Sequence, residues 1–331
     1  MIDVLKLTRE LIDVPSVTGN EFQIGTSLAE LLNRLGYRVE LQDVSSERAN
    51  IIATTESQPR VVFSTHLDTV PPFITSSEDD DFIYGRGACD AKGIIASQIA
   101  AGEKLRTAGV SQFGLLFTID EEVTSAGAKV ANEHPLAAVC EYLINGEPTD
   151  NRLASGTKGS LQASITAAGR AAHSAYPEQG ESAIEKLLDV LTDIRKVKWP
   201  SDNVFGDTTC NIGLVSGGTR ANIIPSEAVA TLQLRLAVDA ATVKDRLEEA
   251  IGGRAALDYK SVHDPVRLST IDGFDQMLAR FTTDIPYLHK WGKPLLIGPG
   301  SILDAHTDHE KVKKSELLRA VDLYVDLVNN L

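Results

Sequence analysis

The chain has 331 residues, of which 43% are hydrophobic and 24% charged. This length exceeds what one hydrophobic core usually serves, so two domains are expected. A net charge of −14, with no basic run or aromatic-basic interleaving, argues against nucleic acid or an anionic membrane as partner. Three cysteines without paired spacing and an N-terminal segment without an apolar signal region favour a cytoplasmic protein with neither disulfides nor a membrane span.

The first 150 residues alternate helix and strand patterns. Amphipathic periodicity, with a stop at Pro15 and a C-terminal Gly36, predicts helices at 3–13, 21–35, 91–108 and 126–133. Short apolar, β-branched runs predict strands at 37–44, 49–55, 60–65, 112–119 and 141–144. Such alternation is typical of a mixed or parallel α/β sheet.

The order of elements changes between residues 154 and 263. Here the patterns predict strand, helix, strand, strand, helix, strand, at 158–168, 182–197, 208–215, 227–237, 241–251 and 255–262. This β-α-β-β-α-β order is the split βαβ, or ferredoxin-like, arrangement. We therefore expect a small α+β domain, 154–263, inserted into a larger domain made of 1–153 and 264–331. The returning chain is expected to form a helix near 274–282, a strand at 294–297 and a closing helix at 313–330.

Polar side chains follow three of the predicted strands of the larger domain. His66 and Asp68 come after the strand at 60–65, Glu121 and Glu122 after the strand at 112–119, and Glu147 after the strand at 141–144. The carboxyl ends of the strands in such a sheet line one edge, where sites collect. These side chains should therefore converge.

Two loops add further candidate ligands. Asp90 lies in a loop rich in glycine, and His306 lies in the loop that follows the strand at 294–297. Imidazoles and carboxylates without a cysteine suit zinc, cobalt or manganese. A second glutamate beside a ligand glutamate can take a proton from metal-bound water, as metal-assisted hydrolysis requires. Asp68 has two possible roles: it can hold the other ring nitrogen of His66, or it can approach the site itself.

Other motifs favour different chemistry only weakly. Gly85-x-Gly87 before a helix is similar to a dinucleotide-binding loop, but the third glycine falls out of register at Gly93. No Gly-x-Ser-x-Gly elbow occurs, which argues against an ordinary serine hydrolase. Cys89 has no neighbouring histidine to activate it and is expected to be a small packed residue.

The motifs in order are STHLDTVP, YGRGACDAKG, IDEE, NGEP, AAHSAYPEQG, GGTRANIIPSEA and IGPGSILDAHT. Together they resemble the co-catalytic zinc amidohydrolases and peptidases, the family that includes acetylornithine deacetylase, succinyl-diaminopimelate desuccinylase, aminoacylase and glutamate carboxypeptidase. The resemblance spans nearly the whole chain. It implies an α/β metal-binding domain that carries an inserted lid and dimerisation domain.

The resemblance implies a ligand set for two divalent metal ions, zinc in the first place, with cobalt or manganese able to substitute. His66 and Glu147 would bind one ion, Glu122 and His306 the other, and Asp90 would bridge them. A cis peptide bond is often found after the bridging aspartate of this family.

The resemblance also implies roles around the metals. Glu121 would be the general base, Asp68 would support His66, and His173 would polarise the scissile carbonyl. The substrate carboxylate would meet Asn222, Gly300 and Ser301.

The sequence departs from the family at one point. Family members commonly have Asp-Glu shortly after the last ligand, whereas here Asp308-His309-Glu310 follows Thr307. His309 therefore competes with His306 for the assignment as ligand. The Ala-His-Thr context favours His306.

The function implied is hydrolysis of the amide bond of a small N-acyl amino acid by a metal-bridging water that Glu121 activates. Within the family, the chain looks most similar to biosynthetic deacetylases such as acetylornithine deacetylase, an enzyme of arginine biosynthesis. A dipeptidase or carboxypeptidase of the same family is the alternative, and a non-catalytic binding protein would be expected to have lost ligands. The resemblance further implies a homodimer through the inserted domain, in which His173 acts either on the partner's site or on its own.

Overall fold

The computed structural model describes residues 2–55 and 58–331. The chain divides into two compact units. Unit 1 comprises the residues up to Ser155 together with Leu268–Met277 and Thr283–Leu331, and unit 2 comprises Gly156–Arg267 and Leu278–Thr282. Within the described residues, no helix is both long and apolar enough to cross a lipid bilayer.

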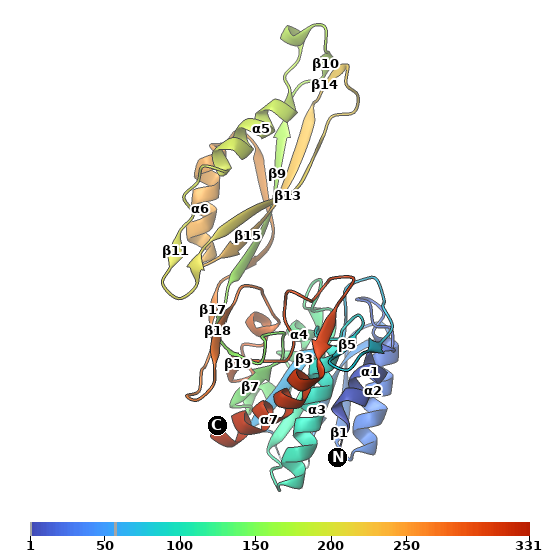
Figure 1. The fold of residues 1–331 in the computed structure, drawn as a ribbon. Helices are drawn as coiled ribbons and strands as arrows, with labels where there is room; N and C mark the ends of the chain where they lie inside the picture. The colour runs from blue at the N-terminus through green and yellow to red at the C-terminus, as the bar shows by residue number, and fades with distance from the viewer. Residues whose placement is uncertain (1, 56–57) are drawn as a thin grey trace. The chain divides into compact units, whose positions relative to one another are not determined.

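Unit 1 is built on a six-stranded mixed sheet (Figure 1). Its spatial order is β1 (Arg38–Ser45), β2 (Arg48–Thr54), β6 (Phe113–Thr118), β3 (Val61–His66), β7 (Tyr142–Asn145), β19 (Lys293–Leu296). β3 runs parallel to both β6 and β7, and β19 runs parallel to β7. The carboxyl ends of these four strands therefore lie at the same edge of the sheet.

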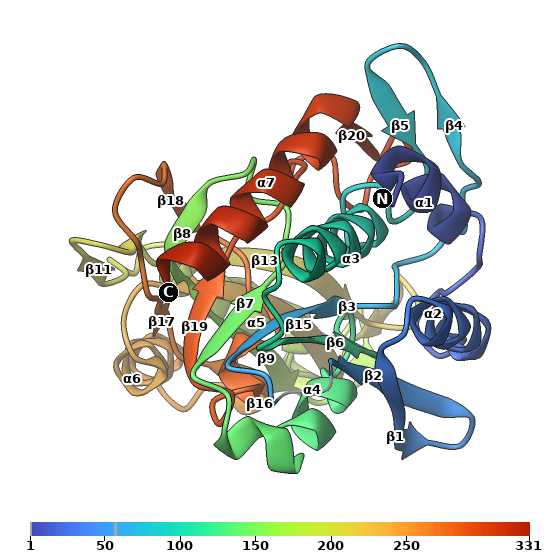
Figure 2. The same ribbon diagram turned by 90° about the horizontal axis from the view of Figure 1, so that it is seen from below.

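Helices cover both faces of this sheet (Figure 2). One face packs against helices whose apolar side chains form the main core: α1 (Val4–Ile12), α2 (Phe22–Arg34), α3 (Lys92–Thr107) and α7 (Lys314–Asn330). The other face packs against α4 (Ala126–Ala131) and the short 3-10 helix η1 (Pro135–Ala138). Because strand side chains alternate, Val61 and Phe63 join the first core and Val62 joins the second.

Unit 2 is an antiparallel sheet covered by two helices. Its spatial order is β13 (Thr209–Gly217), β15 (Glu227–Leu236), β9 (Gly159–Ala168), β16 (Ala256–His263). The helices α5 (Ala183–Ile194) and α6 (Ala240–Ile251) begin at Ser182 and Asp239, whose side chains cap them. The β-α-β-β-α-β order expected from the sequence is confirmed.

Short elements complete both units. One small sheet contains β20 (Lys311–Lys313), β5 (Phe82–Tyr84) and β4 (Ser77–Glu78). A second contains β17 (Val266–Arg267), β8 (Leu153–Thr157) and β18 (Gln276–Ala279). A third pairs β10 (Ala172–His173) with β14 (Ile223–Ile224). A hairpin joins β11 (Ser201–Asp202) to β12 (Gly206–Asp207), and 3-10 helices form at η2 (Pro177–Gln179) and η3 (Ile285–Tyr287).

The prediction of a helix at 274–282 is wrong, because the strand β18 lies in this segment. The amides of Leu153 and Lys158 donate to the carbonyl oxygens of Asp275 and Ala279, so β18 pairs with β8. Over so short a segment, an amphipathic pattern does not separate a helix from a strand. The partner strand, distant in sequence, decides the conformation.

Candidate metal centre

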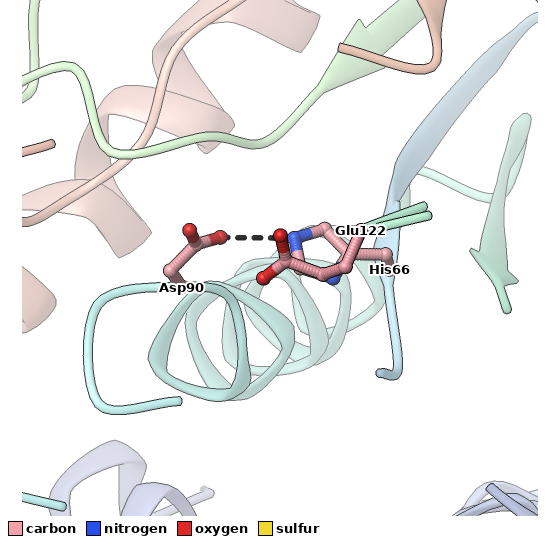
Figure 3. Close-up of side chains that lie close together, drawn as sticks. All are labelled: His66, Asp90 and Glu122. Atoms are coloured by element: carbon pink, nitrogen blue, oxygen red, sulfur yellow. Dashed lines mark hydrogen bonds and ion pairs between the residues drawn. The ribbon is translucent and has the colours of Figure 1, made fainter. Parts of the chain in front are cut away.

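The polar residues predicted to converge lie at the carboxyl edge of the unit 1 sheet. His66 ends β3 and stands opposite Thr118, the last residue of β6. Figure 3 shows the side chains of His66, Asp90 and Glu122 approaching one another from three separate segments. One ligand atom from each lies within 4.8 Å of the others.

The carboxylate of Asp90 stands between two imidazoles. Its Oδ1 is 2.9 Å from His66 Nε2, and its Oδ2 is 3.3 Å from His306 Nε2. His306 Nε2 also lies 3.0 Å from Glu122 Oε1. A carboxylate with one oxygen turned towards each imidazole has the arrangement needed to bridge two cations.

His306, rather than His309, is the histidine brought to Asp90. Its backbone has a φ of +62°, in the left-handed region that residues other than glycine seldom adopt. Such conformations cluster at functional sites, where the surrounding structure holds them in place. The backbone amide of His309, three residues on, donates to Thr307 Oγ1.

Glu147 adds a carboxylate without a protein partner for one of its oxygens. The residue is only 4% exposed, and its Oε1 has no hydrogen-bond partner among the described residues. Buried polar atoms are nearly always satisfied, so an orphaned carboxylate oxygen indicates a missing cation or donor. Burial raises the pKa of Glu147 well above its ordinary value, although His66 opposes the rise.

The neighbouring groups carry a surplus of negative charge. Desolvation raises the pKa of Glu121 well above its ordinary value, and the carboxylate of Glu147 adds to the rise. Hydrogen bonds to Asp90 and Glu122 raise the pKa of His306 to about 10. Crowded carboxylates of this kind favour divalent cations, which neutralise them without a proton. The donor set therefore fits two metal ions.

Asp68 holds the segment that carries Glu121 and Glu122. Its fully buried carboxylate accepts hydrogen bonds from Glu121 N at 3.1 Å, Glu122 N at 3.2 Å and Thr18 Oγ1 at 2.8 Å. For His66, the closer contact runs from Nδ1 to the backbone carbonyl oxygen of Asp68 at 2.9 Å, whereas the carboxylate lies 3.7 Å away. Since a carbonyl only accepts, Nδ1 donates to it, so Nε2 is the ring nitrogen that would face a bound metal.

Gly300 and Ser301 lie beside the Asp90 loop. Gly300 has a φ of +85°, and a Cβ added there would stand 2.5 Å from the Cβ of Cys89. Only glycine fits this approach, and Cys89 is fully buried, as expected of a small packed residue. The amide of Gly300 donates to Glu316 Oε2 at 3.1 Å, and Ser301 forms a β-bridge with Thr149.

His173 and Asn222 lie together at one end of unit 2. His173 in β10 pairs with Ile223 in β14, and Ser174 N donates to the carbonyl oxygen of Asn222 at 3.1 Å. The ring Nδ1 of His173 accepts from Ala175 N at 3.1 Å. The histidine is exposed at this end.

Sequence reasoning missed two buried acids of unit 1. Asp284 accepts a hydrogen bond from Thr118 Oγ1 at 2.7 Å, and burial raises its pKa to about 6. Glu310 binds the backbone of the Asp90 loop. The departure around His309 was the one signal that could have directed attention to Glu310. The cis peptide implied by the resemblance is present at Asp90–Ala91.

The comparisons with known proteins agree on one family. The family model M20_dimer, a peptidase dimerisation domain, matches residues 155–257. A peptidase M20 domain-containing protein of Schizosaccharomyces pombe is 38% identical over 98% of this chain and 84% of its own length. A probable carboxypeptidase of Aspergillus niger is 36% identical over 98% of this chain and 88% of its own length.

Solved structures share the fold at lower identity. A tripeptidase from Staphylococcus aureus superposes with a TM-score of 0.83 at 20% identity, over 98% of this chain and 96% of that one. An M20 family metallo-carboxypeptidase from Sulfolobus solfataricus gives a TM-score of 0.80 at 17% identity, over 100% and 99%. With curated relatives that match nearly its whole length, the chain belongs to the M20 family of metallopeptidases and is a hydrolase.

Proposed function

We propose that the chain is a dinuclear-metal peptidase that cleaves small peptides next to a free terminal carboxylate, as a carboxypeptidase or dipeptidase does. The observation that carries the proposal is the carboxylate of Asp90, with one oxygen towards His66 and one towards His306. Relatives named probable carboxypeptidases favour a peptide bond over the N-acyl amino acid expected first. We therefore place peptidase activity ahead of deacetylation.

The proposed ligands divide into two sets that share Asp90. His66 and Glu147 would hold one ion, and Glu122 and His306 the other. The orphaned oxygen of Glu147 and the excess of carboxylates support cation binding by these residues. When bound, two zinc ions supply Lewis-acid activation of water and of the scissile carbonyl. Zinc as the natural metal and a cytoplasmic location both stay predictions.

Glu121 is proposed as the general base. It takes a proton from the attacking water and returns it to the leaving amine. Desolvation and the charge of Glu147 raise its pKa, which makes its carboxylate a stronger base. The hydrogen bond from its amide to Asp68 fixes where its side chain begins.

The end of unit 2 that carries His173 is proposed to bind the substrate. His173 would polarise the scissile carbonyl, and Asn222 would meet the terminal carboxylate. Gly300 and Ser301 of unit 1 stay predicted contacts of the substrate. Arg220, exposed and two residues before Asn222, offers a cation for that carboxylate. A guanidinium can bind a carboxylate through two parallel hydrogen bonds. A free carboxylate on the substrate is what this group would recognise.

Unit 2 is also proposed to form a homodimer through β13. This edge strand exposes Leu214 at 69% and Val215 at 58%, and Leu188 on the neighbouring α5 is 53% exposed. Unpaired edge strands of soluble proteins are usually covered, and a two-fold axis would cover two of them at once. The match to a dimerisation family model over this unit supports the proposal.

Subunit mixing tests whether His173 serves the partner's site. Glu121→Gln chains and His173→Ala chains are each expected to be inactive. If the histidine acts on the partner, mixed dimers contain one site with both residues intact, so activity returns as subunits exchange. Mixtures that stay inactive after demonstrated exchange would show that His173 acts on its own subunit or not at all.

A hydrolysis screen tests the reaction itself. Zinc-loaded protein is given dipeptides and tripeptides, the same peptides with amidated carboxyl termini, and N-acetyl amino acids. We expect cleavage of the peptides with free carboxylates and a large loss on amidation. Faster cleavage of N-acetyl amino acids would restore the deacetylase interpretation.

A further inference from the structure

The side chain of Glu310 accepts hydrogen bonds from the loop that leads to Asp90. Its Oε1 accepts from the amides of Gly87 at 3.0 Å, Cys89 at 3.2 Å and Asp90 at 3.2 Å. Its Oε2 accepts from Arg86 Nη1 at 2.7 Å. Both Glu310 and Arg86 are 1% exposed.

We infer that Glu310 is a positioning residue that holds Asp90 in its bridging orientation between two metal ions. The inference rests on the proposed dinuclear site. Three amides of one loop converge on a single carboxylate oxygen, and one of them belongs to Asp90 itself. Glu310 is not placed to bind a metal, because its oxygens are occupied by the loop and by Arg86.

The Asp90 loop needs such an acceptor because it has little regular structure. Gly85 and Gly87 have φ values of +136° and +90°, so this segment forms neither helix nor strand. A buried amide without a partner costs free energy comparable to a lost hydrogen bond. Glu310 satisfies three amides at once, which selects one conformation of the loop.

Glu310 also ties the two metal-binding loops together. It lies four residues after His306 on the segment between β19 and α7, and its own carbonyl oxygen accepts from Gly85 N at 3.0 Å. The position of His306 relative to Asp90 therefore depends on contacts at Glu310. A buried Arg–Glu pair such as Arg86–Glu310 contributes little net stability on average, and a geometric role explains it better.

Glu310→Gln tests the inference with a nearly isosteric change. Its single oxygen cannot serve both the three amides and Arg86. The control is Glu103→Gln, which removes a carboxylate that pairs with Arg106 on α3. Zinc affinity is measured by competition with a chromophoric chelator, alongside the thermal unfolding of each metal-free protein.

We expect Glu310→Gln to bind zinc about 10–100-fold more weakly, the usual effect of losing a group that orients a ligand. Glu103→Gln should bind two ions with wild-type affinity. Electron paramagnetic resonance of the di-cobalt forms should show weaker coupling between the ions in Glu310→Gln, a change that simple destabilisation does not produce. Wild-type affinity and coupling in a folded Glu310→Gln protein would overturn the inference.

If Glu310→Gln fails to fold, a second variant and a measurement on the wild-type protein still test the inference. Glu310→Asp keeps the charge but withdraws the carboxylate by about 1.5 Å, one C–C bond, and should also lose zinc affinity. In the wild-type chain, zinc should slow hydrogen exchange at the amides of Gly87, Cys89 and Asp90, and unchanged exchange would count against the inference. A wild-type chain that binds no zinc would instead refute the proposed function.

Discussion

Asp68→Asn should impair the enzyme through the segment that carries Glu121, even though the side chain keeps its size. Each oxygen of the Asp68 carboxylate accepts one backbone hydrogen bond, from the amide of Glu121 at 3.1 Å and from the amide of Glu122 at 3.2 Å. Asparagine has one acceptor oxygen, so its NH2 group must face one of these amides. At least one charge-assisted hydrogen bond is lost, and a buried donor is left without a partner.

A hydrogen bond to a charged group contributes about 1.5–3 kcal/mol, so the free energy of unfolding should fall by about that amount. At roughly 2–4 °C per kcal/mol, the melting temperature of the metal-free protein should fall by about 3–12 °C. Displacement of Glu121 by about 1 Å would lower turnover on the order of 100-fold.

The assay is thermal unfolding together with kcat at saturating zinc. Thr18→Val serves as the control, because it removes only the hydroxyl that donates to Asp68 Oδ2 and should cost less than tenfold in kcat. An Asp68→Asn protein with wild-type melting temperature and turnover would refute the reasoning.

Three further predictions concern the metal centre. Glu121→Gln should lower turnover by about 10²–10⁴-fold while elemental analysis still finds bound metal, and retained turnover would remove Glu121 as the base. His306→Ala should weaken zinc binding and His309→Ala should not; the reverse result would move the ligand by three residues. The folded-state pKa values of Glu121 and Glu147 are raised, so their contribution to stability is complete below about pH 4.5 and is lost as the pH rises through those values. The melting temperature of EDTA-treated protein should therefore fall as the pH rises above about 4.5, zinc should abolish most of the fall, and a pH-independent melting temperature would contradict these shifts.

Much of the fold was predictable because its elements carry strong local patterns. β3 begins with the apolar run Val61–Phe63, every residue of β3 and β6 is buried, and α5 and α6 are amphipathic helices with capping residues. The segment at 274–282 was not predictable in this way. Its conformation depends on pairing with β8, more than a hundred residues earlier in the chain.

The candidate site shows the same division. His66, Glu122 and Glu147 follow strands, so strand direction alone predicts that they converge. The hydrogen bonds of Asp68 depend on backbone amides, and no pattern of residue types reveals which amides a carboxylate will meet. Glu310 was hidden for the same reason: it acts on the backbone of a loop more than two hundred residues away.

The most direct test of the dinuclear site is a zinc titration of EDTA-treated protein, followed by bound metal and by hydrolysis of a dipeptide with a free carboxylate. Asp90 turns one oxygen to each histidine, so we predict that binding and activity both reach a plateau at two zinc ions per chain. Asp90→Ala should bind neither ion tightly, since both share that carboxylate. Full activity at one equivalent, or unchanged zinc binding by Asp90→Ala, would contradict the account.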